Sequence, residues 1–150
     1  MFATRWSLAM NPAAPEPTSP SKTHEFLRDV ETALASQALP LFEEAARHAR
    51  RGGIEVTVEM DSSDPLHPQL SLAASNPGTR TSHYRIIADA ANLGLVHEEF
   101  YAFNDETRTL PAQLASINET VIDTRLAAFF LKAFALPLDY VTERRQAGFW

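Results

Sequence analysis

The sequence contains no cysteine, so disulfide bonds, thiolate metal ligands and a cysteine nucleophile are all excluded. Glycine is also scarce, with five in 150 residues. The glycine motifs that cradle phosphate groups, GxGxxG and GxxxxGK[ST], are absent, as is the GxSxG motif that carries a serine nucleophile. No apolar run approaches the roughly 20 residues of a membrane span. These absences remove several function classes that a sequence can reveal directly.

Positive charge is limited as well. Thirteen Lys and Arg face nineteen Asp and Glu, for a net charge of -6. Nucleic-acid binding normally needs a basic footprint, so we expect neither nucleic acid nor a membrane as a partner. The basic cluster at residues 47–51 ends a predicted helix, where cations complement the helix dipole. The first residues lack the apolar core of a secretory signal, and we predict a cytoplasmic protein.

The chain has enough length and apolar content for one domain with its own core. Of its 150 residues 45% are hydrophobic, and a domain of this size buries about 68–70% of the surface of the unfolded chain. Residues 11–21 hold four of the ten prolines and few large apolar groups. We therefore predict a disordered or loosely attached Pro-rich tail over residues 1–22 and a single domain over residues 23–150.

Hydrophobic periodicity predicts two helical regions. Apolar residues recur every three or four positions from Thr23. Pro40 interrupts this stripe, so the region is either one kinked helix or a helix over residues 23–37 followed by a second from Leu39. The last helix should begin with a capping box, Ser116 at the N-cap and Glu119 three residues later.

Four strands are predicted between these helices. Alternation of apolar residues and turn signals place them at residues 54–60, 69–75, 84–90 and 95–103. The predicted fold class is α+β: a four-stranded antiparallel meander, flanked by an N-terminal kinked helix or helix pair and a C-terminal helix, in two layers. The second face of such a sheet is left to water or to a partner.

The predicted hairpin of the third and fourth strands has large apolar side chains on that second face. A turn at Asn92–Gly94 would make opposed residue numbers sum to about 186, which places Arg85 opposite Tyr101. The face would combine aromatic, aliphatic and charged groups, as binding surfaces do. The predicted partner-binding residues are Arg85, Ile87, Leu95, His97, Tyr101 and Phe103. Alternatively, the C-terminal segment with Tyr140, Phe149 and Trp150 folds over this face, or the face is solvated.

The same hairpin holds the residues that come nearest to catalytic or metal chemistry. His97, Glu99 and Asp89 could approach a three-ligand site, but no spaced motif such as HExxH is present. The interpretation that we prefer is a surface ion pair. We therefore assign no catalytic residue, no metal and no cofactor.

The resulting hypothesis is a non-enzymatic protein-interaction domain, dimerising, adaptor-like or chaperone-like. It would use the outer face or an edge of its sheet to hold a protein partner or a second copy, most simply as a homodimer. In size, acidity, lack of cysteine and element order the chain resembles the small chaperones of bacterial secretion systems. Those place a helix among their strands where none is predicted here, and no residue role is carried over.

The alternative is a small-ligand-binding domain or enzyme. Its pocket would lie between the sheet and the last helix, beside Glu98. If Glu98 points inward, its pKa should be raised, as in many buried functional sites. The pocket would be lined by Glu98, Phe100, Phe129, Phe130 and Phe134.

Overall fold

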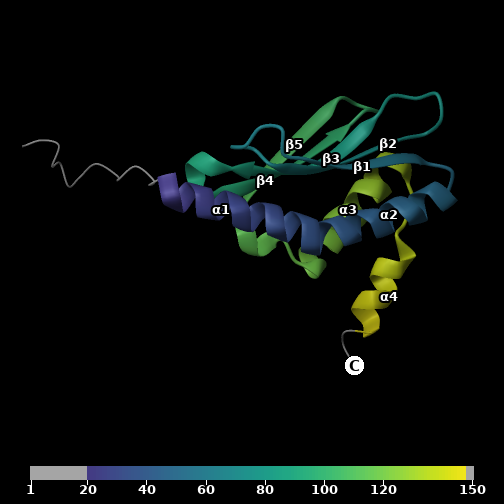
Figure 1. The fold of residues 1–150 in the computed structure, drawn as a ribbon. Coiled ribbons are helices and arrows are strands. Elements are labelled where there is room, and N and C mark those ends of the chain that lie inside the picture. The colour runs from purple at the N-terminus through teal and green to yellow at the C-terminus, as the bar shows by residue number, and fades with distance from the viewer. Residues whose placement is uncertain (1–19, 148–150) are drawn as a thin grey trace, which may run out of the picture.

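A computed structural model describes residues 20–147 of the chain (Figure 1). Most of the predicted Pro-rich tail, together with Phe149 and Trp150, lies outside the described residues. The fold is α+β, as predicted, with an antiparallel sheet flanked by N-terminal and C-terminal helices. Figure 1 shows the sheet above and the helices below it, so that the helices cover one face only.

The helical elements are α1 (Pro20–Ala33), the π-helical segment η1 (Leu34–Ala38), α2 (Leu39–Arg51), α3 (Glu119–Phe134) and α4 (Asp139–Ala147), with short 3-10 helices η2 (Ala90–Asn92) and η3 (Leu114–Ser116). The strands are β1 (Glu55–Asp61), β2 (Gln69–Ser75), β3 (Ser82–Asp89), β4 (Gly94–Tyr101) and β5 (Glu106–Ala112).

The sheet is a meander of five strands in chain order, so the prediction of four strands was wrong. The missed strand, β5, has the sequence ETRTLPA. It lacks the period of two that reveals a half-buried strand, because most of its side chains are exposed on both faces. Proline at position 111 also argued against a strand, although proline is tolerated on an edge strand.

The N-terminal helical region runs alongside the sheet as one continuous rod (Figure 1). Leu39 donates its N–H to the carbonyl of Leu34, an i→i+5 bond that defines the π-turn. Pro40 follows at once, in the first turn of α2. Since proline lacks an N–H and its ring crowds the preceding turn, the wider π-turn accommodates it without ending the helix. The rod begins at Pro20, three residues before the predicted start.

The core lies between this rod, α3 and the inner face of the sheet. Tyr84 of β3 stacks on Phe42 of α2, with ring centroids 5.3 Å apart. Phe129 of α3 packs near Tyr84 and Tyr101, with centroid distances of 6.4 and 5.8 Å. Each such buried side chain contributes about 1.5–3 kcal/mol through removal of apolar surface from water. Truncation of Phe129 to alanine would therefore open the centre of the core.

The register of the β3–β4 hairpin differs from the predicted one. Asp89 pairs with Gly94 and Ile87 with Val96, so opposed residue numbers sum to 183. The loop spans four residues and ends at Leu93, whose φ of 48° is left-handed. Gly94 is the first strand residue, and a Cβ there would lie 3.0 Å from the carbonyl oxygen of Ala112. The glycine thus allows β5 to approach closely. Because the register shifts by an odd number of residues, every side chain of β4 lies on the face opposite to the predicted one.

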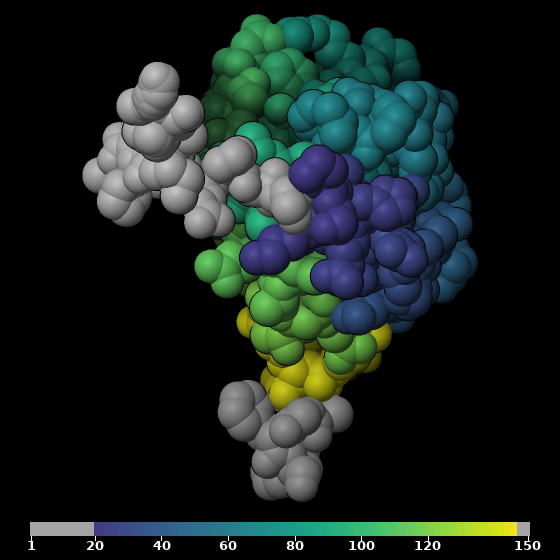
Figure 2. Space-filling model, turned by 60° about the vertical axis from the view of Figure 1, so that its left-hand side comes forward, coloured from purple at the N-terminus to yellow at the C-terminus, as the bar shows by residue number. Residues whose placement is uncertain are grey.

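The C-terminal helices are held by polar groups. The N-cap of α3 is Asn118 and not Ser116: its side chain accepts a hydrogen bond from the N–H of Val121 at 2.9 Å. The short C-terminal helix α4 packs below α2 and α3, on the helix side of the molecule (Figure 2). Tyr140 at its start lies 5.4 Å from the ring of His48 and does not cover the outer face of the sheet.

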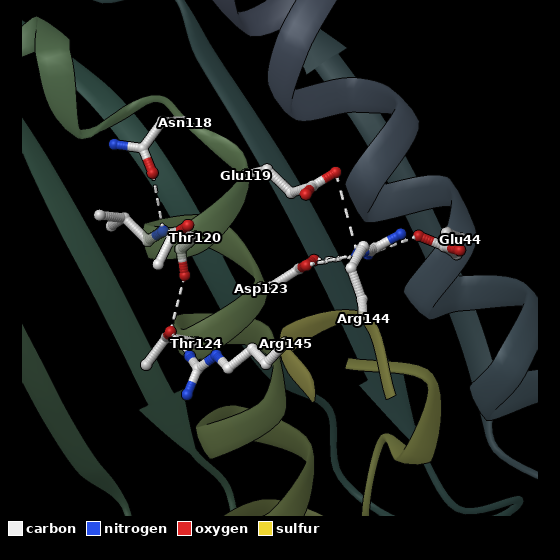
Figure 3. A network of polar contacts seen from close by, with 9 residues as sticks. Glu44, Asn118, Glu119, Thr120, Asp123, Thr124, Arg144 and Arg145 are labelled. Carbon is white, nitrogen blue, oxygen red and sulfur yellow. Dashed lines mark hydrogen bonds and ion pairs between the residues drawn. The ribbon is translucent and has the colours of Figure 1, made fainter. Parts of the chain in front are cut away.

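One arginine joins α4 to both neighbouring helices (Figure 3). Arg144 donates to both carboxylate oxygens of Asp123, each at 2.9 Å, and to Glu44 at 2.9 Å, with Glu119 at 3.8 Å. Burial raises the pKa of the Asp123 carboxyl, and the Arg144 guanidinium opposes that shift. Hydrogen bonds to Glu44 and Asp123 in turn raise the pKa of Arg144. The Arg144 guanidinium thus offsets part of the cost of burying the Asp123 carboxylate.

Candidate binding site at the open edge of the sheet

The structure divides the six predicted partner-binding residues between two sides of the sheet. Arg85 and Ile87 lie on the outer face, as expected. Leu95, His97 and Tyr101 are buried on the inner face, because the odd register shift reverses β4. Phe103 lies in the turn after β4 and is 63% exposed. The six residues do not form one surface.

The charged groups of the outer face already bind one another. Glu98 accepts from Nε2 of His83 at 3.1 Å and lies 3.6 Å from Nη1 of Arg85. His83 also stacks on Phe100, with ring centroids 5.4 Å apart. Desolvation by burial and the nearby Arg85 cation lower the pKa of His83, and the Glu98 carboxylate opposes them. Glu98 therefore points outward into an ion pair, contrary to the inward orientation of the alternative hypothesis.

The predicted ligand pocket is also divided. Glu98 and Phe100 lie on the outer face, while Phe129 and Phe130 are buried in the core below the inner face. Phe134 packs partly buried against that core. The sheet itself separates the two groups, so these five residues do not line one cavity.

On the inner face lies a buried polar chain centred on His97 of β4, a residue that the sequence analysis placed on the opposite face. His97 is 2% exposed, with Nδ1 2.8 Å from Oη of Tyr84 and Nε2 3.1 Å from Oγ of Ser116. A neutral ring that accepts at Nδ1 and donates at Nε2 satisfies both contacts. Burial, aided by the Arg125 cation, lowers the pKa of His97 to about 4. Burial likewise raises the pKa of Tyr84.

The Ser116–His97–Tyr84 spacing meets the distance criterion for a nucleophile, a base and an orienting group. A general base, however, works best with a pKa near the operating pH. The lowered pKa of His97 makes its ring a weak proton acceptor, and Tyr84 supplies a neutral hydroxyl in place of a carboxylate. The chain of hydrogen bonds therefore satisfies buried polar groups.

A second polar group lies beside this chain, where the core reaches β5. Glu99 accepts from Oη of Tyr101 at 2.7 Å and lies 3.9 Å from Nη1 of Arg125 on α3. Burial and the Glu99 carboxylate raise the pKa of Tyr101. A cavity of about 90 Å³ opens here, lined by His97, Glu99, Arg108, Thr109, Leu110 and Arg125. Its volume corresponds to about three water molecules.

The backbone of β5 forms one free edge of the sheet, and the hydrogen-bond alternation shows which groups point outward. In an antiparallel sheet the backbone polar groups of successive residues point alternately to the two sides. Ala88 donates its N–H to the carbonyl of Pro68 at 3.0 Å, so Ala88 points toward β2. Asp89 therefore points toward β4, and its partner Gly94 points back toward β3.

The same alternation continues into β5. Leu95 follows Gly94 and points toward β5, where it pairs with Ala112. Stepping back along β5 from Ala112, the residues that point away from the sheet are Thr107, Thr109 and Pro111. The edge thus offers the N–H groups of the two threonines and the carbonyls of all three residues.

The opposite edge, β1, is partly closed. The same alternation places the carbonyl of Val56 on the free side of β1. Arg50 of α2 donates to this carbonyl from Nε at 3.2 Å and from Nη2 at 2.9 Å. The contact confirms the direction of the alternation, because a carbonyl turned toward β2 would not be reached from α2. The two edges therefore differ in part: on β1 one outward carbonyl, that of Val56, is capped by Arg50, whereas on β5 no side chain of residues 20–147 bonds to the outward backbone groups.

The open edge borders a groove on the helix side. Arg108 and Leu110 of β5 lie on the inner face beside the flank of α3, and Leu110 is 43% exposed. A second hollow, of about 260 Å³, lies on that flank and is lined by Thr120, Val121, Thr124, Arg125 and Ala128. Arg125 borders both hollows, so they lie next to each other, one on the inner side of β5 and one on the flank of α3; we call the two together the groove.

Sequence reasoning missed this region because its residues give weak signals. The sequence analysis assigned no strand to β5 and no role to Arg125. Within residues 20–147 no group of His, Asp and Glu side chains is placed to hold a metal ion, and none of the helices combines the length and the hydropathy of a membrane span. Comparison with models of known protein families, with curated proteins and with solved structures finds no match.

Proposed function

We propose that the chain is a non-enzymatic protein-interaction domain that holds an extended segment of a partner protein as an added strand on β5. The observation that carries this proposal is the open edge itself: two free N–H groups and three free carbonyls beside a groove. An exposed edge is a template for strand addition. Main-chain hydrogen bonds supply affinity in this binding mode, and side-chain pockets supply specificity.

The outer face supports a partner less well than the edge. Its central charges, His83, Arg85 and Glu98, already form an intramolecular cluster, and Phe100 is stacked under His83. A partner on that face would need to desolvate a satisfied ion pair, which costs free energy. The edge of β5, in contrast, offers backbone groups that have no hydrogen-bond partner within residues 20–147.

A second copy of the chain fits the edge poorly. A two-fold register centred on Arg108 places two like charges opposite each other. A register centred on Thr107 pairs Thr109 with Asp105, which lies in a turn with φ of 59°. A two-fold register centred on Thr109 or Leu110 places Pro111 opposite a threonine, and proline has no N–H to donate to it. The same registers place Arg108 opposite an apolar side chain. We therefore favour a heterologous segment over a homodimer.

The test uses a random peptide library displayed on phage, selected against the full chain. Thr109→Pro removes one outward N–H and leaves the bonds between β5 and β4 intact, as Pro111 already does at an equivalent position. Each peptide carbonyl left without a donor costs about 1–3 kcal/mol, so selected peptides should bind at least about fivefold more weakly to this variant.

Thr109→Val is the matched control, because it changes the same side chain and keeps the N–H. Circular dichroism should show both variants folded. Peptides that bind the parent chain and Thr109→Pro equally would contradict the proposal. Light scattering is run beside the selection: a dimer that Thr109→Pro converts to a monomer would show that a second copy occupies the edge.

A further inference from the structure

The groove beside β5 indicates which side chains the added strand should carry. Resting on the function proposed above, we infer that the segment has an apolar residue followed, two positions later, by an aspartate or glutamate. The carboxylate would bind Arg108 and Arg125, and the apolar residue would pack beside Leu110.

The register follows from the direction of the edge. Thr107 and Thr109 exchange hydrogen bonds with an added antiparallel strand, so the residue opposite Arg108 sits in the pair without hydrogen bonds. Side chains approach most closely in such pairs, with Cα atoms about 4.5 Å apart. That residue points to the inner side, as Arg108 does. The residue opposite Leu110 precedes it by two because the strands are antiparallel.

The charges near Arg108 favour an anionic partner residue. The two nearby carboxylates are engaged elsewhere: Glu99 accepts from Tyr101 at 2.7 Å, and Glu106 accepts from Nζ of Lys132 at 2.8 Å. Arg125 meets Glu99 only at 3.9 Å, which leaves guanidinium donors for another acceptor. Two arginines and one carboxylate, that of Glu99, thus line one small cavity, so cations outnumber anions there in a chain of net charge -6. A carboxylate accepts well from such groups.

The apolar preference comes from the neighbouring surface. Leu110 is 43% exposed, and the α3 flank next to it presents Val121 and Ala128 around the second hollow. A valine or leucine opposite Leu110 would remove apolar surface from water on both partners. A polar residue at that position would gain nothing comparable.

The experiment measures fluorescence anisotropy with a labelled peptide of sequence KTVTETK. Its valine faces Leu110 and its glutamate faces Arg108 when the central threonine pairs with Thr109. The control peptide KTVTQTK replaces the carboxylate with an amide of the same shape. We expect the glutamate peptide to bind the parent chain at least about fivefold more tightly than the glutamine peptide.

Variants of the chain then assign the effect to the groove. Arg108→Glu should reverse the preference, so that KTVTKTK binds more tightly than KTVTETK. Arg85→Gln removes a cation from the outer face and should leave both affinities unchanged. N-methylation of the central threonine, whose N–H faces β5, should abolish binding, whereas N-methylation of the glutamate, whose N–H faces away, should not.

The outcomes separate this inference from the proposed function. If both peptides bind equally and both are lost with Thr109→Pro, the edge holds a strand and the carboxylate assignment is wrong. If the preference for glutamate persists in Arg108→Glu, the inference is also wrong. Absence of binding by either peptide at millimolar concentration overturns the inference, and the library selection against Thr109→Pro decides the proposed function independently.

Discussion

His97 should make the folded chain less stable in mild acid. Its ring is buried between Tyr84, Ser116 and Arg125, and burial lowers its pKa to about 4, against 6.5 for the free side chain. Between these two values the unfolded chain holds a proton on His97 that the folded chain does not. The free energy of unfolding therefore falls as the pH drops from about 6.5 toward 4, and the full contribution is present above pH 6.5.

The size of the effect follows from the displacement of the pKa. One pH unit corresponds to about 1.4 kcal/mol, so acidification to about pH 4.5 would cost just under 3 kcal/mol for a fully enclosed ring. Because a cavity of about 90 Å³ borders His97, the ring is not fully enclosed, and we reduce the expected loss to about 2 kcal/mol. That is a large part of the 5–15 kcal/mol typical of a domain.

Urea unfolding followed by circular dichroism at several pH values measures this loss. His97→Gln cannot titrate, so the difference between the parent and variant profiles isolates His97 from the other four histidines and the carboxylates. NMR titration of the His97 ring in the parent chain gives the midpoint even if the variant does not fold. Parallel profiles, or a ring midpoint near 6.5, would refute the buried, neutral histidine described above.

Two further substitutions test other parts of the structure. Arg144→Met leaves Asp123 buried without its cation and frees Glu44, so the urea midpoint should fall by the equivalent of about 3 kcal/mol and α4 should become sensitive to protease. Arg145→Met, one residue on, is the matched control and should change stability by less than about 0.5 kcal/mol. Glu98→Gln on the outer face should lower the free energy of unfolding by less than about 1 kcal/mol. A large gain in stability would instead mean that the Glu98 carboxylate is buried without a compensating cation.

The parts of the fold that the sequence predicted are those with a strong period. β1 and β2 alternate cleanly through Val56 and Leu72, and the helix stripe continues through Pro40 because a π-turn absorbs the ring. The last helix was also predicted, but its cap was displaced by two residues. Ser116 and Asn118 are both good N-cap residues, and tertiary contact decided between them: the Ser116 hydroxyl meets His97.

The candidate site could not be predicted for a different reason. The predicted hairpin loop has three residues and the observed loop has four. This difference reverses the face that each side chain of β4 occupies, and loop length is not encoded by composition alone. A three-residue turn with glycine at positive φ is a common hairpin. Here Leu93 adopts the left-handed conformation instead, and Gly94 is the first strand residue, where the absence of a side chain allows the close approach of β5. The two faces of β4 carry similar numbers of apolar side chains, so the hydrophobic pattern did not reveal the wrong register.

The polar residues that misled the sequence analysis of β4 have a physical explanation in the structure. Along the inner face the strands covered by the helical rod carry aliphatic and aromatic side chains, such as Leu72 and Ile86. Farther across, β4 contributes His97 and Glu99, and β5 contributes Arg108, where helix cover gives way to a cavity. Buried polar groups need partners, and here they find them among themselves and on α3. The change from apolar to polar therefore marks the place where the core ends and the open edge begins. The polar residues that the sequence analysis placed on the outer face, His97 and Glu99, are among those that border the proposed groove.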